Sequence, residues 1–83
     1  MNDENWVQIE SRVREVLARL AEGRQVPDAE ASLTDAGFDS MTKVALIVEL
    51  EEAFGIRFGE ADIDGANFAT LRTIVQLIRG YLP

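Results

Sequence analysis

The sequence predicts an all-α protein, a small four-helix bundle with three main helices, one short helix and a long loop between the first and second helices. Apolar residues recur at intervals of three and four in three separate stretches, which is typical of amphipathic helices. No stretch alternates apolar and polar residues as a half-buried strand would. Residues 24–38 have no sustained period and contain Pro27, so we expect a long connection there. These observations together indicate an up-and-down bundle.

The first helix is predicted over residues 5–22, with one apolar stripe facing the core. Either Asn2 or Asp3 can cap its start, and Gly23 can end it in a left-handed conformation. The stripe consists of Trp6, Ile9, Val13, Val16, Leu17 and Leu20.

The long loop needs anchors, because a structureless connection of this length is uncommon in a small domain. Leu33 and Phe38 are its best candidates, and Ser32 can cap a short turn between them.

Three further segments complete the bundle. The second helix is expected from Ser40 to Phe54, with Gly55 ending it. The next segment contains two glycines and several acids, so we expect at most a turn or two of helix near residues 59–62. Thr70 then caps the last helix. Its apolar positions are Leu71, Ile74, Val75, Ile78 and Tyr81 or Leu82.

Composition excludes several classes of function. The 83 residues suffice for one domain, spanning 1–83, with little room for a deep substrate cleft. The net charge of −7 repels phosphate backbones, so we expect no nucleic-acid partner and favour basic partners. The chain has no Cys and no His, which removes thiolate metal sites, a cysteine nucleophile and the usual general base. We therefore expect a carrying or binding module without catalysis of its own and without a metal site.

The sequence also predicts where in the cell the protein is found. The N-terminal segment lacks a signal peptide, and no apolar run approaches the roughly 18 residues that a membrane span requires. We expect a cytoplasmic monomer with no membrane span.

The second helix has more apolar surface than a core needs. Leu46, Ile47, Leu50 and Phe54 fall on one side and form a sufficient core stripe. Met41, Val44 and Val48 fall on roughly the opposite side, next to the three acids Glu49, Glu51 and Glu52. A bundle this small cannot readily bury both faces, so the second stripe is predicted to be a partner-docking face. The alternative is that the loop or the third segment covers it.

Ser40 admits two interpretations from the residues alone. Asp39 and Ser40 can simply be the hydrogen-bonding residues that start a helix. Alternatively, Asp39 caps the helix alone and the hydroxyl of Ser40 is free. A phosphate on that hydroxyl would lie near the unpaired N–H groups and the positive end of the helix dipole.

The run G-F-D-S-M followed by V-x-L-I-V-E-L-E-E-x-F-G-I, residues 37–56, resembles the attachment motif and second helix of acyl carrier proteins and peptidyl carrier proteins. The resemblance extends over essentially the whole chain and includes Leu46, Leu50, Glu51, Glu52 and Phe54 at the family's spacing. It implies a 4'-phosphopantetheine group, derived from coenzyme A, attached covalently to Ser40. It also implies that Asp39 helps to present the serine and the metal to the transferase, and that Met41 is a neighbouring contact residue.

The resemblance further implies an acyl or aminoacyl carrier. Its partners would be a phosphopantetheinyl transferase, a ligase that loads an acyl or aminoacyl group, and downstream synthases, transferases or tailoring enzymes. In fatty-acid synthesis members the turns after the serine are acidic, whereas Thr42, Lys43 and Ala45 stand there in this chain. The motif with Met, and the segment D-I-D-G-A-N-F-A-T, look more like D-alanine carriers and the discrete carriers of polyketide and nonribosomal peptide pathways. A specialised pathway is therefore expected.

The sequence leaves two other interpretations open. The competing class is a small acidic adaptor that binds a basic partner through Met41, Val44 and Val48 without covalent modification. Residues 60–71 also resemble a calcium loop, but Leu71 replaces the final bidentate Glu, so we expect poor calcium binding.

Overall fold

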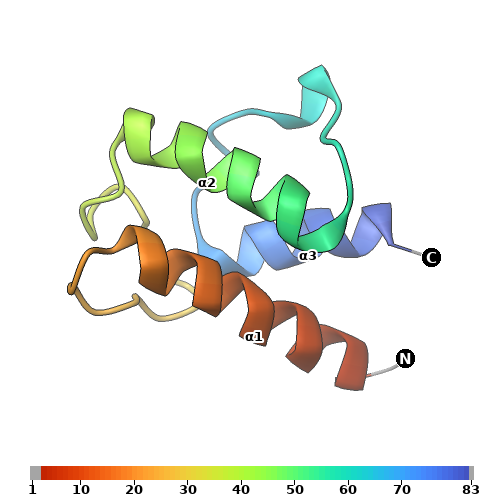
Figure 1. The fold of residues 1–83 in the computed structure, drawn as a ribbon, viewed down its shortest axis with the longest axis horizontal. Coiled ribbons are helices and arrows are strands. Elements are labelled where there is room, and N and C mark those ends of the chain that lie inside the picture. The colour runs from red at the N-terminus through yellow and green to blue at the C-terminus, as the bar shows by residue number, and fades with distance from the viewer. Residues whose placement is uncertain (1–2, 83) are drawn as a thin grey trace.

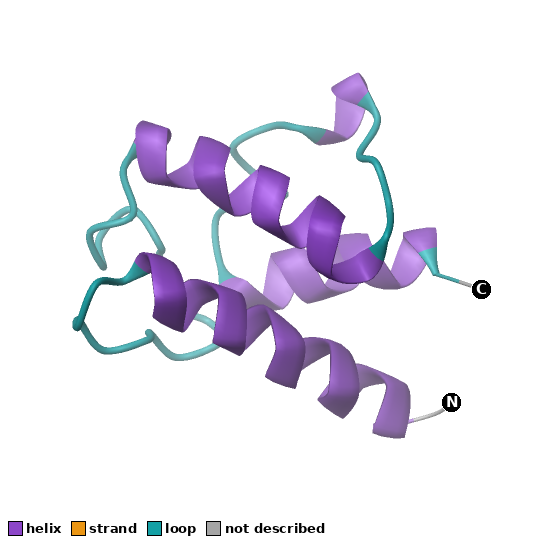
Figure 2. Cartoon of the chain, viewed as in Figure 1, coloured by secondary structure: helices purple, strands orange, loops and turns teal. Residues whose placement is uncertain are grey.

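The computed structural model describes the backbone of residues 3–82 and the side chains of residues 5–82. Its elements are α1 (Asp3–Leu20), α2 (Ser40–Phe54), the 3-10 helix η1 (Glu60–Asp62) and α3 (Leu71–Tyr81). α1 packs against both α2 and α3, and the long first loop closes one end of the bundle (Figures 1 and 2). The described residues contain helices, turns and loops but no strand. The predicted fold class is confirmed.

α1 contributes the predicted apolar stripe, with Ile9, Val13 and Leu17 buried in the core. The helix ends two residues earlier than the sequence analysis predicted, at Leu20 rather than Glu22. Both Glu22 and Gly23 have left-handed backbones, with φ of 53° and 89°, and these angles turn the chain into the loop. At the other end the helix begins at Asp3, two residues before the predicted start, so Asp3 is a helical residue and the prediction that it caps the helix is wrong; the alternative cap, Asn2, lies outside the described residues.

The long loop is anchored as predicted. Leu33 and Phe38 are both fully buried. The N–H of Leu33 donates to the carbonyl of Ala69 at 2.9 Å, which fastens the loop to the segment before α3. The hydroxyl of Ser32 accepts a hydrogen bond from the N–H of Asp35 at 3.2 Å, so Ser32 does cap a short turn. Burial and hydrogen bonding together give the loop a defined course.

The boundaries of α2 and α3 follow from their caps. Gly55 ends α2 with φ of 64°, which glycine adopts without a steric penalty. Thr70 caps α3 in a reciprocal arrangement with Thr73. Within α2, Leu46 and Leu50 are fully buried while Ile47 and Phe54 are partly buried. None of the helices in residues 3–82 is long and apolar enough to cross a membrane.

Candidate functional site

The site begins where Asp39 caps α2. One carboxylate oxygen of Asp39 accepts the N–H of Thr42 at 2.9 Å, and its carbonyl accepts the N–H of Lys43 at 2.9 Å. The bond from Thr42 is the capping bond and uses one of the N–H groups that a helix leaves unpaired at its start, whereas the bond from Lys43 is the first regular bond of the helix. Ser40, the first residue of α2, is exposed, and its hydroxyl makes no hydrogen bond within the described part of the chain. Asp39 thus caps the helix alone and leaves the serine hydroxyl accessible.

The Asp39 carboxylate is stabilised in its charged form. Hydrogen bonds from the backbone and side chain of Thr42 hold the pKa of Asp39 below its ordinary value of 3.8, and the nearby charge of Arg24 lowers it further. Asp39 is therefore ionised at neutral pH. The cap places a negative charge directly beside the serine hydroxyl.

Arg24 fastens the segment that leads into the site, and sequence reasoning missed it. Its side chain donates to the carbonyl of Ala21 at 2.9 Å and to the carbonyl of Gly37 at 3.0 Å. Its guanidinium also lies over the ring of Phe38, 5.6 Å from the centroid. No local pattern indicates this role, because Arg24 lies at the far end of the loop. It connects the end of α1 to the two residues that precede Asp39.

A shallow groove opens beside Ser40. It has a volume of about 210 Å³ and runs between α2 and the segment 63–68. Ser40, Lys43, Val44 and Ile47 line it from α2, and Ile63, Asp64, Gly65 and Phe68 line it from the opposite side. The ammonium of Lys43 donates to the hydroxyl of Thr34 at 2.8 Å, while the side chain borders the groove. An apolar trough that starts at an exposed serine fits a flexible arm of phosphopantetheine type.

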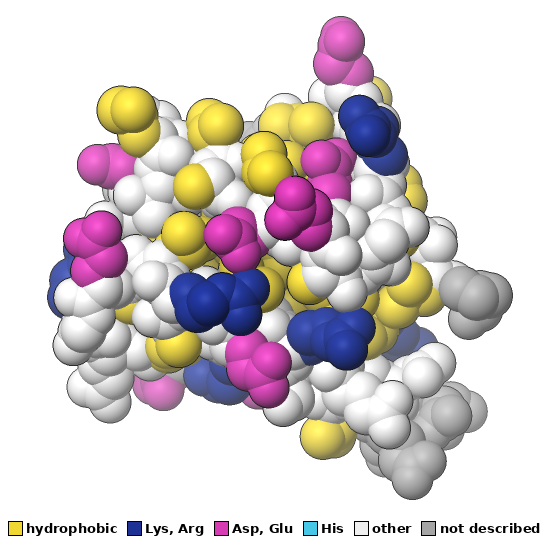
Figure 3. All heavy atoms as spheres, viewed as in Figure 1, with side chains coloured by type: hydrophobic (Ala, Val, Ile, Leu, Met, Phe, Trp, Pro, Cys, Tyr) yellow, Lys and Arg dark blue, Asp and Glu magenta, His cyan; other side chains and the backbone are white. Residues whose placement is uncertain are grey.

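The second apolar stripe of α2 is exposed, as predicted. The exposed fractions of Met41, Val44 and Val48 are 82%, 62% and 50%, and Ile63 extends the same surface. Figure 3 shows hydrophobic side chains gathered over α2, with acidic and basic side chains in a band between α2 and α1. The alternative, that the loop or the third segment covers this face, is wrong. An exposed apolar surface next to Ser40 has the character of a docking face.

The three acids beside this face have different surroundings. Glu49 forms an ion pair with Arg19 of α1 at 2.9 Å. Glu51 accepts the backbone N–H of Phe58 at 2.9 Å. Glu52 is exposed and forms no hydrogen bond or ion pair with the described residues. Of the three, Glu52 alone has a carboxylate without a partner in residues 5–82.

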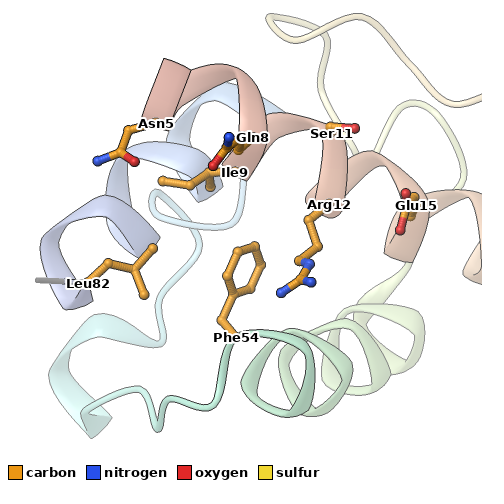
Figure 4. A pocket seen from close by; sticks show the side chains of 8 residues that line it. All are labelled: Asn5, Gln8, Ile9, Ser11, Arg12, Glu15, Phe54 and Leu82. Atoms are coloured by element: carbon orange, nitrogen blue, oxygen red, sulfur yellow. The ribbon is translucent and has the colours of Figure 1, made fainter. Parts of the chain in front are cut away.

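A larger cavity, of about 550 Å³, lies at the opposite end of α2. Phe54 and Arg12 both line it (Figure 4), and Arg12 donates a hydrogen bond to the carbonyl of Ala53 at 3.0 Å. Its other lining residues are Asn5, Gln8, Ile9, Ser11, Glu15 and Leu82. The 15 residues of α2 separate Phe54 from Ser40, about 20 Å at the helical rise per residue. This cavity is therefore not part of the site at Ser40.

In the acidic segment that resembles a calcium loop, two carboxylates accept hydrogen bonds from the protein itself. Asp62 accepts a hydrogen bond from the hydroxyl of Tyr81, and Asp64 accepts the N–H of Asn67. Within the described residues, no group of three or more His, Cys, Asp or Glu side chains is arranged to hold a metal ion.

Comparison with known proteins agrees with this geometry. The profile of the phosphopantetheine attachment site family matches residues 9–78. An acyl carrier protein from Desulforapulum autotrophicum is 35% identical over 74 residues, which cover 86% of this chain and 94% of the relative. An aminoacyl carrier protein from Agrobacterium fabrum is 31% identical over 70 residues, covering 81% of this chain and 84% of the relative.

Solved structures show the same fold. One match is to the crystal structure of an engineered Bradyrhizobium japonicum glycine:[carrier protein] ligase complexed with a carrier protein from Agrobacterium tumefaciens and ATP. The TM-score is 0.74 at 30% identity, over 86% of this chain and 96% of the matched chain. A second match is to the Bradyrhizobium japonicum ligase with its cognate carrier protein and an analogue of glycyl adenylate. It has a TM-score of 0.78 at 23% identity, over 87% and 96% of the two chains, and supports the fold alone.

The family profile covers most of the chain, and the two relatives each align with this chain over most of their own length. The chain therefore belongs to the phosphopantetheine-binding family of acyl and aminoacyl carrier proteins.

Proposed function

We propose that this carrier protein holds a small aminoacyl or acyl group on 4'-phosphopantetheine attached to Ser40 and delivers it to enzymes of a specialised pathway. The observation that carries the proposal is the exposed hydroxyl of Ser40, which stands at the start of α2 and at the mouth of the groove. The prosthetic group supplies a thiol, which the cysteine-free chain lacks, and so allows cargo to be held as a thioester.

The residues around Ser40 have distinct roles in this proposal. Asp39 fixes the start of α2 and leaves its charge beside the hydroxyl, where a phosphopantetheinyl transferase with coenzyme A and Mg²⁺ would act. Val44 and Ile47 offer apolar contacts to an arm that leaves Ser40 along the groove. No other residue is required to react, because the transferase and the loading enzyme supply the chemistry.

Docking is proposed on the exposed face of Met41, Val44 and Val48. A carrier must leave each partner, so a small apolar contact suits its task better than an extensive interface. Glu49, Glu51 and Glu52 border this face, and we assign electrostatic guidance of partners mainly to Glu52, since the other two carboxylates are already engaged. Neutralising Glu52 should therefore slow loading at low salt more than neutralising Glu49.

The type of pathway is inferred from the first turn of α2 and from the relatives. That turn contains no acidic residue. A partner with a basic patch made for an acidic helix would find no complementary charge there. Two comparisons, the aminoacyl carrier protein and the glycine:[carrier protein] ligase complex with the Agrobacterium tumefaciens carrier, point to an aminoacyl-loading ligase as partner. Transfer of an aminoacyl group, or a polyketide or nonribosomal peptide pathway, is accordingly preferred to housekeeping fatty-acid synthesis.

The test is intact mass after incubation with a permissive phosphopantetheinyl transferase, coenzyme A and Mg²⁺. The wild-type chain and Ser11→Ala should each gain the mass of one phosphopantetheine, because Ser11 is an exposed serine of α1 away from the groove. Ser40→Ala should gain none. A folded wild-type chain that stays unmodified, while the transferase modifies another carrier, would refute the assignment and favour a noncovalent adaptor.

A further inference from the structure

One wall of the groove belongs to a segment with little secondary structure of its own. Between α2 and α3, the three residues of η1 (Glu60–Asp62) are the only helical turn assigned in residues 56–69. A single turn without a side-chain cap does not hold its position unaided. Ile63 and Phe68, which face α2 across the groove, follow directly in this segment. The position of the wall therefore depends on contacts with the rest of the molecule.

Tyr81, at the end of α3, makes two of these contacts. Its hydroxyl donates to the carboxylate of Asp62 at 2.5 Å and accepts the backbone N–H of Gly59 at 2.7 Å. Gly59 directly precedes η1 and Asp62 is its last residue, so a single side chain holds the start and the end of the turn. In Figure 1 the turn stands at the outer edge of the arch that joins α2 to α3.

Aromatic contacts continue from Tyr81 to the groove. The ring of Tyr81 meets the ring of Phe58 edge to face at 5.4 Å, and Phe58 meets Phe68 in the same way at 5.4 Å. Both phenylalanines are nearly fully buried in the core, and Phe68 also lines the groove. Contacts thus run without interruption from the last helix to the floor of the groove beside Ser40.

We propose that Tyr81 and Asp62 are positioning residues that hold segment 59–68 against the bundle and so fix the width of the groove beside Ser40. We call the two hydrogen bonds of Tyr81, to Asp62 and to Gly59, the tether. That the groove binds the arm and its cargo rests on the proposed function, whereas the existence of the tether does not. Glu51 of α2 holds the residue directly before this segment, through the N–H of Phe58. The segment is therefore fixed from both of the helices that it connects.

The charges near Tyr81 provide an independent readout of the tether. Donation to Asp62 raises the pKa of Tyr81 above its ordinary value of 10.0, and the charges of Asp62 and Glu51 add to the rise. Tyr81 is the only tyrosine of the chain, so its ultraviolet titration reports this one hydroxyl. Asp62→Asn should lower the pKa of Tyr81 toward its ordinary value. A structural change that leaves the hydrogen bond between Tyr81 and Asp62 intact would not lower the pKa of Tyr81 in this way.

The first experiment uses the unmodified chain and compares Tyr81→Phe with wild type by amide hydrogen exchange. Tyr81→Phe keeps the ring contact with Phe58 but removes both hydrogen bonds. Exchange at residues 59–68 should become at least about tenfold faster, because the loss of one hydrogen bond alone accounts for roughly that factor and this variant loses two, while α1 is unaffected. The matched control is Glu30→Gln, which weakens a 2.6 Å contact from the first loop to Arg72 of α3 and should leave residues 59–68 unchanged. Equal exchange in Tyr81→Phe and wild type would overturn the proposal.

The second experiment asks whether the tether shapes the groove when cargo is present. A permissive transferase attaches a butanoyl-phosphopantetheine arm, and methyl resonances of Ile47 and Ile63 are compared with those of the unmodified chain. The shifts caused by the arm with its cargo should be clear in wild type and at least roughly halved in Tyr81→Phe, in which residues 59–68 are no longer held. Equal shifts in the two chains would show that the tether does not set the groove. If no arm attaches to the wild-type chain, the proposed function fails, and the exchange experiment still decides whether Tyr81 holds the segment.

Discussion

At the scale of single residues, Gly37 has the strictest requirement in the motif. Its backbone is left-handed, with φ of 101°, and an added Cβ would lie 2.0 Å from a guanidinium nitrogen of Arg24. The flexible end of Arg24 can move away, at the loss of its bond to the Gly37 carbonyl, but the backbone strain remains. We expect Gly37→Ala to lower the free energy of unfolding by roughly 1–3 kcal/mol, measured by urea denaturation with Trp6 fluorescence. Gly65→Ala, where an added Cβ meets no atom within 4 Å, is the control and should change it little.

A second single-residue effect is the ionisation of the Asp39 carboxyl group, which stabilises the start of α2. Its pKa in the folded chain lies below the ordinary value of 3.8, so its stabilising contribution is fully present above that value. That contribution is lost as the pH falls through the lowered pKa of the folded state. We expect the amide resonance of Thr42 to follow this titration below about pH 4. In Asp39→Asn the transition should disappear, and its persistence would assign the titration to another group.

At the scale of elements, one face of α2 is buried in the core and the other is exposed, so we expect the buried face to determine stability and the exposed face to determine partner docking. Val44→Gln and Val48→Gln should leave the free energy of unfolding nearly unchanged, because both side chains are already exposed. Each should lower kcat/KM for phosphopantetheine transfer by about tenfold if the lost apolar contact contributes roughly 1–2 kcal/mol to docking. Val7→Gln is the matched control, since Val7 is 61% exposed on α1. An equal loss in all three variants would place the docking face elsewhere.

Glu51 and Glu52 are sequence neighbours with opposite expected roles. Glu51 holds the N–H of Phe58, so Glu51→Ala leaves that donor without its partner and should cost roughly 1–2 kcal/mol of unfolding free energy. Glu52→Ala removes only an exposed charge and should change stability by less than about 0.5 kcal/mol. Thermal unfolding of the two variants side by side measures the difference. Equal losses would contradict the contact assigned to Glu51.

At the scale of the whole molecule, the features that could be predicted from the sequence are those that depend on residues close together in the chain, namely the helices and their caps. Helical periodicity located the three main helices. Thr70 caps α3 as its side-chain chemistry predicted, Gly55 ends α2 as glycine's conformational freedom predicted, and Asp39 caps α2 in one of the two ways that the sequence left open. Helical geometry also sorted α2 into a buried and an exposed stripe. The end of α1 was predicted too late, since two consecutive left-handed residues have no periodic signal.

The rest of the site depends on contacts between residues distant in sequence. Arg24 reaches Gly37 across the loop, and Tyr81 reaches Asp62 and Gly59 from the final helix. The groove has a wall from each of two segments, with residues 40–47 on one side and 63–68 on the other. Pairings of this kind arise only when the bundle closes, so no local pattern indicates them. For the same reason, the different surroundings of Glu49, Glu51 and Glu52 were not visible in their shared acidic run.

Closure of the bundle depends on the first loop, which joins α1 to the motif. Leu33 is fully buried there, and its N–H binds the carbonyl of Ala69 just before α3. Leu33→Ala should cost roughly 2–5 kcal/mol through the lost burial and the cavity left behind, a large share of the roughly 5–15 kcal/mol typical of a domain. Urea denaturation measures this loss, with the partly buried Leu77→Ala as the milder control. Under conditions where Leu33→Ala is still folded, phosphopantetheine transfer should also slow, because the displaced loop carries Gly37 and Asp39 out of position. A stability loss below about 1 kcal/mol would mean that Phe38 and Arg24 hold the loop without Leu33.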